Sequence, residues 1–307
     1  IWYSFFLKFN IRISMDKTPD DSLNNLSRHL AIQELKGNSI GFLRTYPQNI
    51  KSGFIGYFYD HYYFVWGEDS NNKMNKTKNY INNIVTSGYP YFELKNNFKS
   101  YNSFKRNDNF FNILLMDTNH SLNNEKIKLS TKHNFQFYYR KDIENFYNKF
   151  LDLLAKNKKY RLIIKPKKYN EFIKLQNIIK KLRNNLDIKN RILIIKEQNV
   201  RPIQLKEFVD ISIVTSVYFP TAVIECIAAD MKTIFYDLYN VCNNENYLIK
   251  LIKKNNIYNQ LDMLINDIIN NREIGLSNNE LIDKTIAKEL NYKELITNEI
   301  VKLIDNR

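Results

Sequence analysis

Apolar residues after about residue 108 fall into short continuous runs separated by longer amphipathic segments. The runs are NFFNILLMD (109–117), YRLIIKP (160–166), RILIIK (191–196), VDISIVTS (209–216) and KTIFYD (232–237). Between them, helical spacing extends over 142–156, 169–185 and 220–230. Strands that are apolar throughout and alternate with helices are typical of a parallel sheet covered on both faces. The pattern therefore predicts a doubly wound α/β domain.

The first 88 residues predict a smaller α/β unit. Strands are expected near 1–13, 38–44 and 59–67, with a helix near 21–36. The opening run IWYSFFLKFNIRIS is interrupted by Lys8 and Arg12, which favours a core strand over a signal peptide. Because the chain begins with Ile1 and this unit looks incomplete, we expect part of the fold to lie upstream.

The predicted boundaries follow from breaks in this pattern. Residues 81–92 contain a strand and then a glycine–proline break, which we interpret as the crossover between two domains. Helical patterns without catalytic composition follow residue 244. The expected division is 1–88, 89–272 and a terminal helical segment over 273–307.

Composition excludes several classes of protein. Of 307 residues, 44% are hydrophobic, and no window of 18 apolar residues is free of charge, which argues against a membrane-spanning helix. Cys226 and Cys242 are too few for a disulfide framework and lack CxxC spacing, so we expect a reducing compartment and no zinc site. No metal-binding cluster emerges from the sequence.

The positive charge is concentrated in one stretch. The formal net charge is +14, and residues 156–196 hold fourteen lysines and arginines against Glu171 and Asp187, a local charge of +12. Such a block faces either solvent or an anion, and the candidates are a nucleotide diphosphate, an anionic membrane surface or nucleic acid. The lysines of the helix expected at 169–183 fit a solvated face.

Glycines are almost confined to the first unit. Six of the seven precede residue 89, and only Gly275 follows. GxGxxG and GxxxxGK[ST] loops are therefore excluded from the larger domain, and a phosphate bound there must be held by side chains and helix N-termini.

Candidate binding residues follow the predicted strands, since ligands of such sheets bind at the carboxyl ends of the strands. Lys165 and Lys167 flank Pro166 at one strand end. The strand predicted at 209–216 ends in two hydroxyl residues, Thr215 and Ser216. The helix that follows opens at Pro220 and Thr221, and Glu225 lies one turn later. Together they could bind phosphate and ribose. Alternatively, the lysines form an ordinary turn, Thr221 only caps the helix, and Glu225 is a surface residue.

Three segments resemble GT-B glycosyltransferases. VDISIVTSVYFPTAVIECIAADMKTIFYD (209–237) looks like their donor-site segment, and RLIIKPKK (161–168) resembles the Lys-Pro-His-Pro segment of bacterial surface-polysaccharide transferases, including the CDP-glycerol glycerophosphotransferase, sialyltransferase and Kdo-transferase groups. YFVWGEDSNNKM followed by NIVTSGYPYF looks like the crossover between their two domains. Lys167 and Lys168 replace the expected histidine and second proline, and Phe219 and Pro220 stand where paired serines are common.

The resemblance implies a GT-B-like fold and roles for particular residues. Residues 1–88 would be the carboxyl-terminal part of an acceptor-side domain and 89–272 the nucleotide-sugar donor domain. Lys165 would bind donor phosphate, Thr221 the phosphate or sugar, and Glu225 the ribose. The catalytic base of such enzymes comes from the acceptor-side domain, where Asp16, Asp20 and His61 are the candidates, although each could be structural.

The sequence therefore predicts a metal-independent glycosyltransferase, without a cofactor, that moves a sugar from a nucleotide donor onto a surface glycan or lipid-linked glycan. Its expected location is the cytoplasm, with peripheral contact to an anionic membrane. Two alternatives stay open. One is transfer of a polyol phosphate from a CDP donor. The other, less expected, is a non-catalytic RNA-binding protein that uses the basic block with Tyr160 and Tyr169 for stacking.

Overall fold

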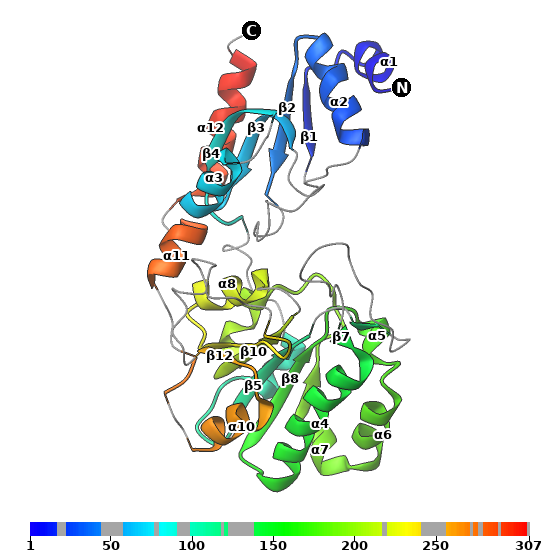
Figure 1. Ribbon diagram of the computed structural model, residues 1–307, viewed down its shortest axis with the longest axis vertical. Helices are drawn as coiled ribbons and strands as arrows, with labels where there is room; N and C mark the ends of the chain where they lie inside the picture. Colours follow the sequence, from blue (N-terminus) through cyan, green and yellow to red (C-terminus); the bar gives the residue numbers. More distant parts are fainter. Residues whose placement is uncertain are drawn as a thin grey trace. The chain divides into compact units, whose positions relative to one another are not determined.

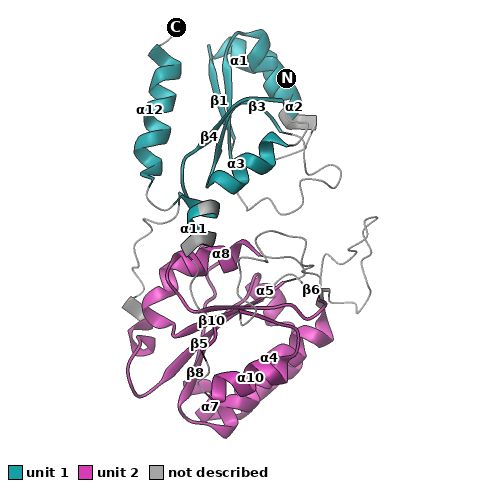
Figure 2. Cartoon of the chain, turned by 60° about the vertical axis from the view of Figure 1, so that its left-hand side comes forward, with its two compact units in different colours: residues 1–90, 280–307 teal, residues 91–279 magenta. Residues whose placement is uncertain are grey.

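The computed structural model forms two compact units, residues 1–90 with 280–307 (unit 1) and residues 91–279 (unit 2) (Figure 1; Figure 2). The structure describes residues 1–16, 23–43, 58–76, 80–90, 99–117, 120–121, 138–216, 220–240, 256–270, 273–275, 279–287 and 290–305.

Unit 1 contains a four-stranded parallel sheet in the order β1-β2-β3-β4. Its strands are β1 (Ile13–Asp16), β2 (Asn38–Phe42), β3 (Tyr59–Val65) and β4 (Tyr80–Thr86). Its helices are α1 (Trp2–Lys8), α2 (Leu23–Glu34), α3 (Glu68–Asn75), α12 (Tyr292–Asp305) and most of α11 (Asn279–Ile286). Side chains of α12 pack with Ile40 and Phe64 from one face of this sheet.

Unit 2 contains a six-stranded parallel sheet in the order β12-β11-β10-β5-β8-β9. The strands are β5 (Phe111–Met116), β8 (Tyr160–Lys165), β9 (Ile192–Ile194), β10 (Ile211–Thr215), β11 (Thr233–Tyr236) and β12 (Ile257–Tyr258). Numbered along the chain this is the order 3-2-1-4-5-6 of doubly wound dinucleotide-binding folds, and the order reverses between β5 and β10. The predicted parallel, doubly wound sheet is confirmed.

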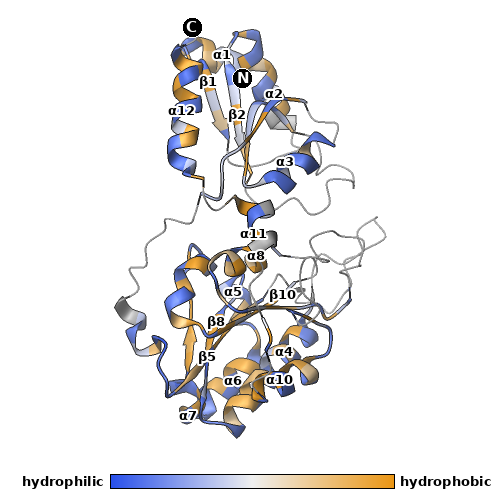
Figure 3. Cartoon of the chain, turned by 90° about the vertical axis from the view of Figure 1, so that its left-hand side faces the viewer, coloured by the Kyte–Doolittle hydropathy of each residue, from blue (hydrophilic) through white to orange (hydrophobic). Residues whose placement is uncertain are grey.

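Helices and short segments surround this sheet. They are η2 (Lys99–Phe104), α4 (Arg140–Lys156), α5 (Tyr169–Phe172), α6 (Gln176–Asn184), α7 (Leu186–Asn190), η3 (Pro202–Phe208), α8 (Thr221–Ala228) and α10 (Leu261–Ile269), beside a two-stranded ladder of β6 (His120–Ser121) and β7 (Tyr138–Tyr139). The core on one face joins Phe146 and Phe150 of α4 to Ile113, Leu162 and Ile213 of the strands. The middle of β8 (162–164) and the last four residues of β5 (113–116) are accordingly hydrophobic (Figure 3).

Two of the predicted elements are wrong in detail. The opening segment is the helix α1, not a strand, because Phe6 packs with Ala31, Ile32 and Leu35 of α2. A short apolar run fits either a buried helix or a buried strand, so periodicity could not decide. The helix expected over 169–185 is broken between α5 and α6, and this break allows Leu175 to be buried together with Phe172 and Ile178.

Candidate functional site

The carboxyl edge of the unit 2 sheet brings the predicted binding residues together. Register places Met116 beside both Lys165 and Val214, so β5, β8 and β10 end within one residue of one another at the same edge. Asp117 follows β5 directly, and Thr215 ends β10. This edge contains the point between β5 and β10 where the strand order reverses, which is where doubly wound sheets bind ligands.

Asp117 fixes the Lys165–Pro166–Lys167 turn. Its carboxylate accepts hydrogen bonds from the backbone N–H of Lys167 and from the Tyr147 hydroxyl, the latter at 2.9 Å. Burial raises the pKa of Asp117 to about 6, although both hydrogen bonds and the charges of Lys165 and Lys167 act in the opposite direction. Asp117 therefore holds the two lysines at the mouth of the sheet.

Lys165 lies among several charges. It is half-buried, while Lys167 is exposed. Burial lowers the pKa of Lys165, and the charges of Lys167 and Arg201 lower it further, whereas Asp117 and Glu197 raise it. Among the described contacts, Lys165 Nζ donates to the carbonyl of Pro166 at 3.4 Å. Three cations thus gather at one edge of the sheet.

Glu225 and Arg201 connect α8 to the loop after β9. The Glu225 side chain is 3% exposed, and its Oε1 lies 3.5 Å from a terminal nitrogen of Arg201. The Arg201 side chain is 34% exposed. Close by, the Tyr101 hydroxyl donates to Glu197 at 2.8 Å. We call Asp117, Lys165, Lys167, Arg201 and Glu225 the carboxyl-edge cluster.

The remaining predicted residues of this edge differ in their surroundings. Thr215 and Ser216 are buried, and the Thr215 hydroxyl donates to the carbonyl of Tyr236 at 3.1 Å. Pro220 caps α8, and Thr221 begins it, both partly exposed. The expected opening of this helix at Pro220 is confirmed, whereas the connecting residues Val217–Phe219 lie outside the described part of the chain.

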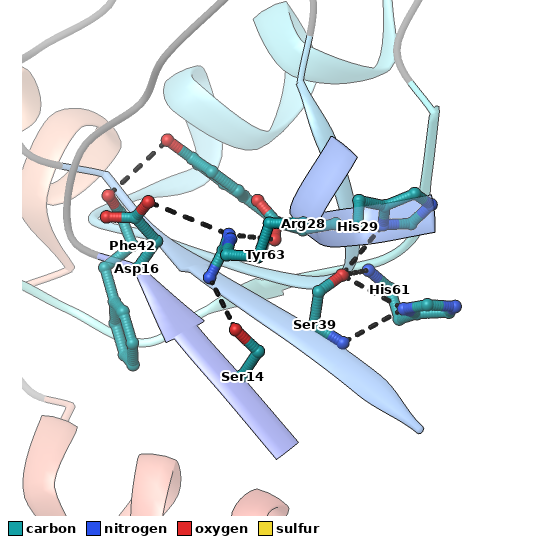
Figure 4. Close-up of polar contacts among 9 residues, drawn as sticks. Ser14, Asp16, Arg28, His29, Ser39, Phe42, His61 and Tyr63 are labelled. Carbon is teal, nitrogen blue, oxygen red and sulfur yellow. Dashed lines mark hydrogen bonds and ion pairs between the residues drawn. The ribbon is translucent and has the colours of Figure 1, made fainter. Parts of the chain in front are cut away.

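Two of the three candidate bases belong to a polar network in unit 1 (Figure 4). Arg28, which is 5% exposed, donates to Ser14 at 3.0 Å and to Asp60 at 3.3 Å, and it lies 3.8 Å from Asp16. Burial raises the pKa of Asp60 to about 7 and outweighs the opposing charge of Arg28. Asp16 ends β1 and keeps 23% of its side chain exposed.

His61 belongs to the second half of this network. The Ser39 hydroxyl lies 2.9 Å from His29 Nδ1 and 3.0 Å from His61 Nδ1, and the backbone N–H of Ser39 donates to His61 Nδ1. The two imidazoles stack with ring centroids 4.7 Å apart. Burial lowers the pKa of both rings, that of His29 to about 4. We call Ser14, Asp16, Arg28, His29, Ser39, Asp60 and His61 the unit 1 network; Asp20 lies outside the described residues.

Much of the basic block faces solvent or supports the fold. Lys174, in the exposed turn between α5 and α6, pairs with the partly buried Glu171, and Lys181 pairs with Asp152 on exposed helix surfaces. Arg191 is buried and donates to three backbone carbonyls and to Asp187. Tyr160 is 3% exposed, so it cannot serve as the stacking surface that the RNA-binding alternative needs.

Two features are absent from the part of the chain that the structure describes. None of the helices there has the length and apolar character needed to cross a membrane. In the same part of the chain, no three histidine, cysteine or acidic side chains gather in a way that could hold a metal ion.

Sequence reasoning did not identify Arg201, Tyr147 or Tyr101. Arg201 stands before Pro202 at the start of η3, a weak signal for a helix cap and none for a ligand. Tyr147 lies on the buried face of the amphipathic α4, where the sequence gives no signal for a polar contact. The contacts that bring these residues to the edge join segments far apart in sequence.

Solved structures resemble this chain over nearly its whole length. Staphylococcus aureus MnaA in complex with UDP has a TM-score of 0.61 at 12% identity, covering 99% of this chain and 79% of that one. Anabaena HepE in complex with UDP-glucose has a TM-score of 0.52 at 10% identity, covering 99% and 82%. A chain of the GtfA/B complex has a TM-score of 0.51 at 11% identity, covering 99% and 60%. These likenesses show the fold, which is GT-B-like with two parallel sheets.

Sequence comparison gives the family. No curated protein matches the chain. Residues 38–263 match the family described as "Polysaccharide biosynthesis PFTS motif protein", and this span includes the whole carboxyl-edge cluster. Because the match covers well over half of the 307 residues, the chain belongs to the polysaccharide biosynthesis PFTS motif family.

Proposed function

We propose that this protein is a glycosyltransferase that moves a sugar from a nucleotide-activated donor onto a surface glycan or a lipid-linked glycan. Three observations support the proposal: the family's role in polysaccharide biosynthesis, the GT-B-like fold shared with proteins solved with UDP or UDP-glucose, and the carboxyl-edge cluster. The observation that carries it is the gathering of Lys165 and Lys167 at the edge where such sheets bind ligands.

The cluster suits the leaving group of sugar transfer. Breaking the bond between the anomeric carbon and the donor phosphate releases a nucleotide with developing negative charge. We assign Lys165 and Lys167 to stabilise that charge without a metal ion, and the hydrogen bond from Lys167 N–H to Asp117 supports this assignment because it fixes their turn. We assign Thr221 to the phosphate or sugar and Glu225 to the ribose, as the resemblance implies.

The acceptor hydroxyl needs a base, for which we propose Asp16. Its carboxylate is partly exposed at the end of β1, while Arg28 lies 3.8 Å away and orients it. His61 is less suited, because its Nδ1 already receives the N–H of Ser39. Asp16→Asn should therefore abolish transfer while leaving donor binding unchanged.

A thermal-shift panel tests the donor assignment. We expect stabilisation by at least one of CMP, CDP, UDP and GDP, and none by a short RNA. The responding nucleotide also bears on the enzymatic alternatives. Transfer of a polyol phosphate from a CDP donor breaks the bond between the two phosphates and releases CMP, so a response to UDP or GDP alone would exclude it. Steeply salt-dependent RNA binding without a response to any nucleotide would contradict the proposed function.

A further inference from the structure

A third cation, Arg201, lies at the carboxyl edge in addition to the two lysines. It follows the loop after β9, whereas Lys165 ends β8, so the two reach the edge from neighbouring strands. Its charge is close enough to lower the pKa of Lys165. Like charges placed together repel one another, and an anion bound between them removes that repulsion.

Glu225 explains why Arg201 stays at this edge. The carboxylate is almost fully buried, and a buried charge requires a partner, which Arg201 supplies at 3.5 Å. The contact uses Oε1 of Glu225 and one terminal nitrogen of the guanidinium, a group with five N–H donors arranged in a planar fork. About a third of the Arg201 side chain remains exposed.

We propose that Arg201 is a phosphate-binding residue of the donor site and that Glu225 is the positioning residue that holds it there. This rests on the proposed function, because the ligand is the diphosphate of the nucleotide donor. A guanidinium can bind two phosphate oxygens at once, whereas each lysine supplies a point charge. Arg201 thereby favours a diphosphate over a monophosphate or an uncharged nucleoside.

The test uses three ligands that separate phosphate from ribose: UDP, uridine and inorganic pyrophosphate, measured by calorimetry on the full chain. Arg201→Gln should weaken UDP and pyrophosphate about tenfold to a hundredfold and leave uridine unchanged. Arg201→Lys, which keeps the charge and the buried partner, should recover part of the loss. Arg183→Gln, at an exposed arginine of α6 in the same basic stretch, is the matched control and should change nothing.

Glu225→Gln separates positioning from ribose contact, because pyrophosphate has no ribose. The substitution should weaken pyrophosphate in the wild-type background and have no further effect in Arg201→Gln. If Glu225→Gln lowers the pyrophosphate affinity equally in the wild type and in Arg201→Gln, or lowers it in neither, Glu225 does not act through Arg201.

The proposal and the proposed function fail in different ways. If UDP binds and Lys165→Ala weakens it while Arg201→Gln does not, Arg201 is structural and the donor site stands without it. UDP binding that pyrophosphate does not displace would also overturn the role of Arg201. If the wild type binds none of CMP, CDP, UDP, GDP and pyrophosphate, the proposed function itself is contradicted.

Discussion

The two charged clusters of this protein differ in where their cations are placed. In the unit 1 network, one arginine is buried among two carboxylates and a serine. In the carboxyl-edge cluster, Lys165, Lys167 and Arg201 gather where solvent reaches them, and Asp117 and Glu225 are the buried members. This difference agrees with the proposed roles, in which the first cluster stabilises its unit and carries the proposed base Asp16, while the second binds the donor phosphate.

Arg28→Met gives the largest expected effect. At pH 8, where Asp60 of the wild type is ionised, removing a buried arginine leaves this carboxylate without its charged partner, which costs about 3–5 kcal/mol of unfolding free energy for unit 1. Both tryptophans, Trp2 and Trp66, lie in unit 1, so urea unfolding followed by tryptophan fluorescence reports on this unit. The loss should shrink at pH 5, where Asp60 is protonated.

Lys302→Met is the control for that experiment. It removes an exposed lysine of α12 paired only with Glu299 among described contacts, so the change should stay below about 0.5 kcal/mol. If both variants unfold at the same urea concentration as wild type, Arg28 does not stabilise the unit.

Lys165→Ala tests the second cluster. Donor nucleotide binding should weaken by about 1.5–3 kcal/mol, because a charged hydrogen-bond donor to phosphate is lost. Unit 1 fluorescence and its unfolding midpoint should not change. Lys180→Ala, at an exposed lysine of α6, is the matched control, and equal affinity in all three proteins would reduce the Lys165–Lys167 segment to an ordinary turn.

Gly41→Ala tests how tightly the unit 1 network is packed. A methyl group at position 41 would overlap with Asp60 Oδ2 and with the buried ring of Tyr63. Either neighbour must move, which should cost about 1–2 kcal/mol of unfolding free energy. A midpoint equal to wild type would mean that the Asp60 carboxylate is free to shift away.

The pH dependence of unit 1 stability gives the smallest effect and separates two opposing groups. His29 has its pKa lowered to about 4, so the stability it contributes is present above pH 6.5 and is lost as pH falls toward 4. Asp60 has its pKa raised to about 7, so its contribution is present below pH 4 and is lost as pH rises through 7.

Two variants resolve these opposing contributions. In Asp60→Asn, unit 1 should become more stable as pH rises from 4.5 to 6.5, whereas in His29→Gln it should become less stable over the same rise. Urea midpoints at four pH values measure how the stability of unit 1 changes with pH in each variant. The same pH dependence in both variants would contradict the opposing contributions of Asp60 and His29.

The sequence predicted the parts of the fold that depend on local pattern. The strands β5, β8, β10 and β11 were visible because parallel strands buried on both faces are continuous apolar runs. The segment of α1 was ambiguous, because an apolar run of that length fits either kind of buried element. Its helical state follows from packing against α2, which periodicity does not contain.

The sequence predicted the residues of the candidate site that follow strand ends, but not the residues that contact them from distant segments. Lys165, Thr221 and Glu225 were identified because they follow apolar strands, and strand ends are recognisable in sequence. The partner of Glu225, Arg201, lies 24 positions away on another segment, and Tyr147 meets Asp117 across 30 positions. Such pairs depend on strand order, which a single sequence does not specify.

Hydrogen–deuterium exchange with saturating donor nucleotide, chosen by the thermal-shift panel, compares the two clusters in one experiment. We predict slower exchange at residues 165–168, 197–202 and 220–226, because bound phosphate restrains the segments that carry Lys165, Lys167, Arg201 and Glu225. Residues 59–65 of β3, which carry Asp60 and His61 of the unit 1 network, should exchange as they do without ligand. Slowing confined to unit 1, or no slowing at the carboxyl edge of unit 2, would contradict a donor site in the carboxyl-edge cluster.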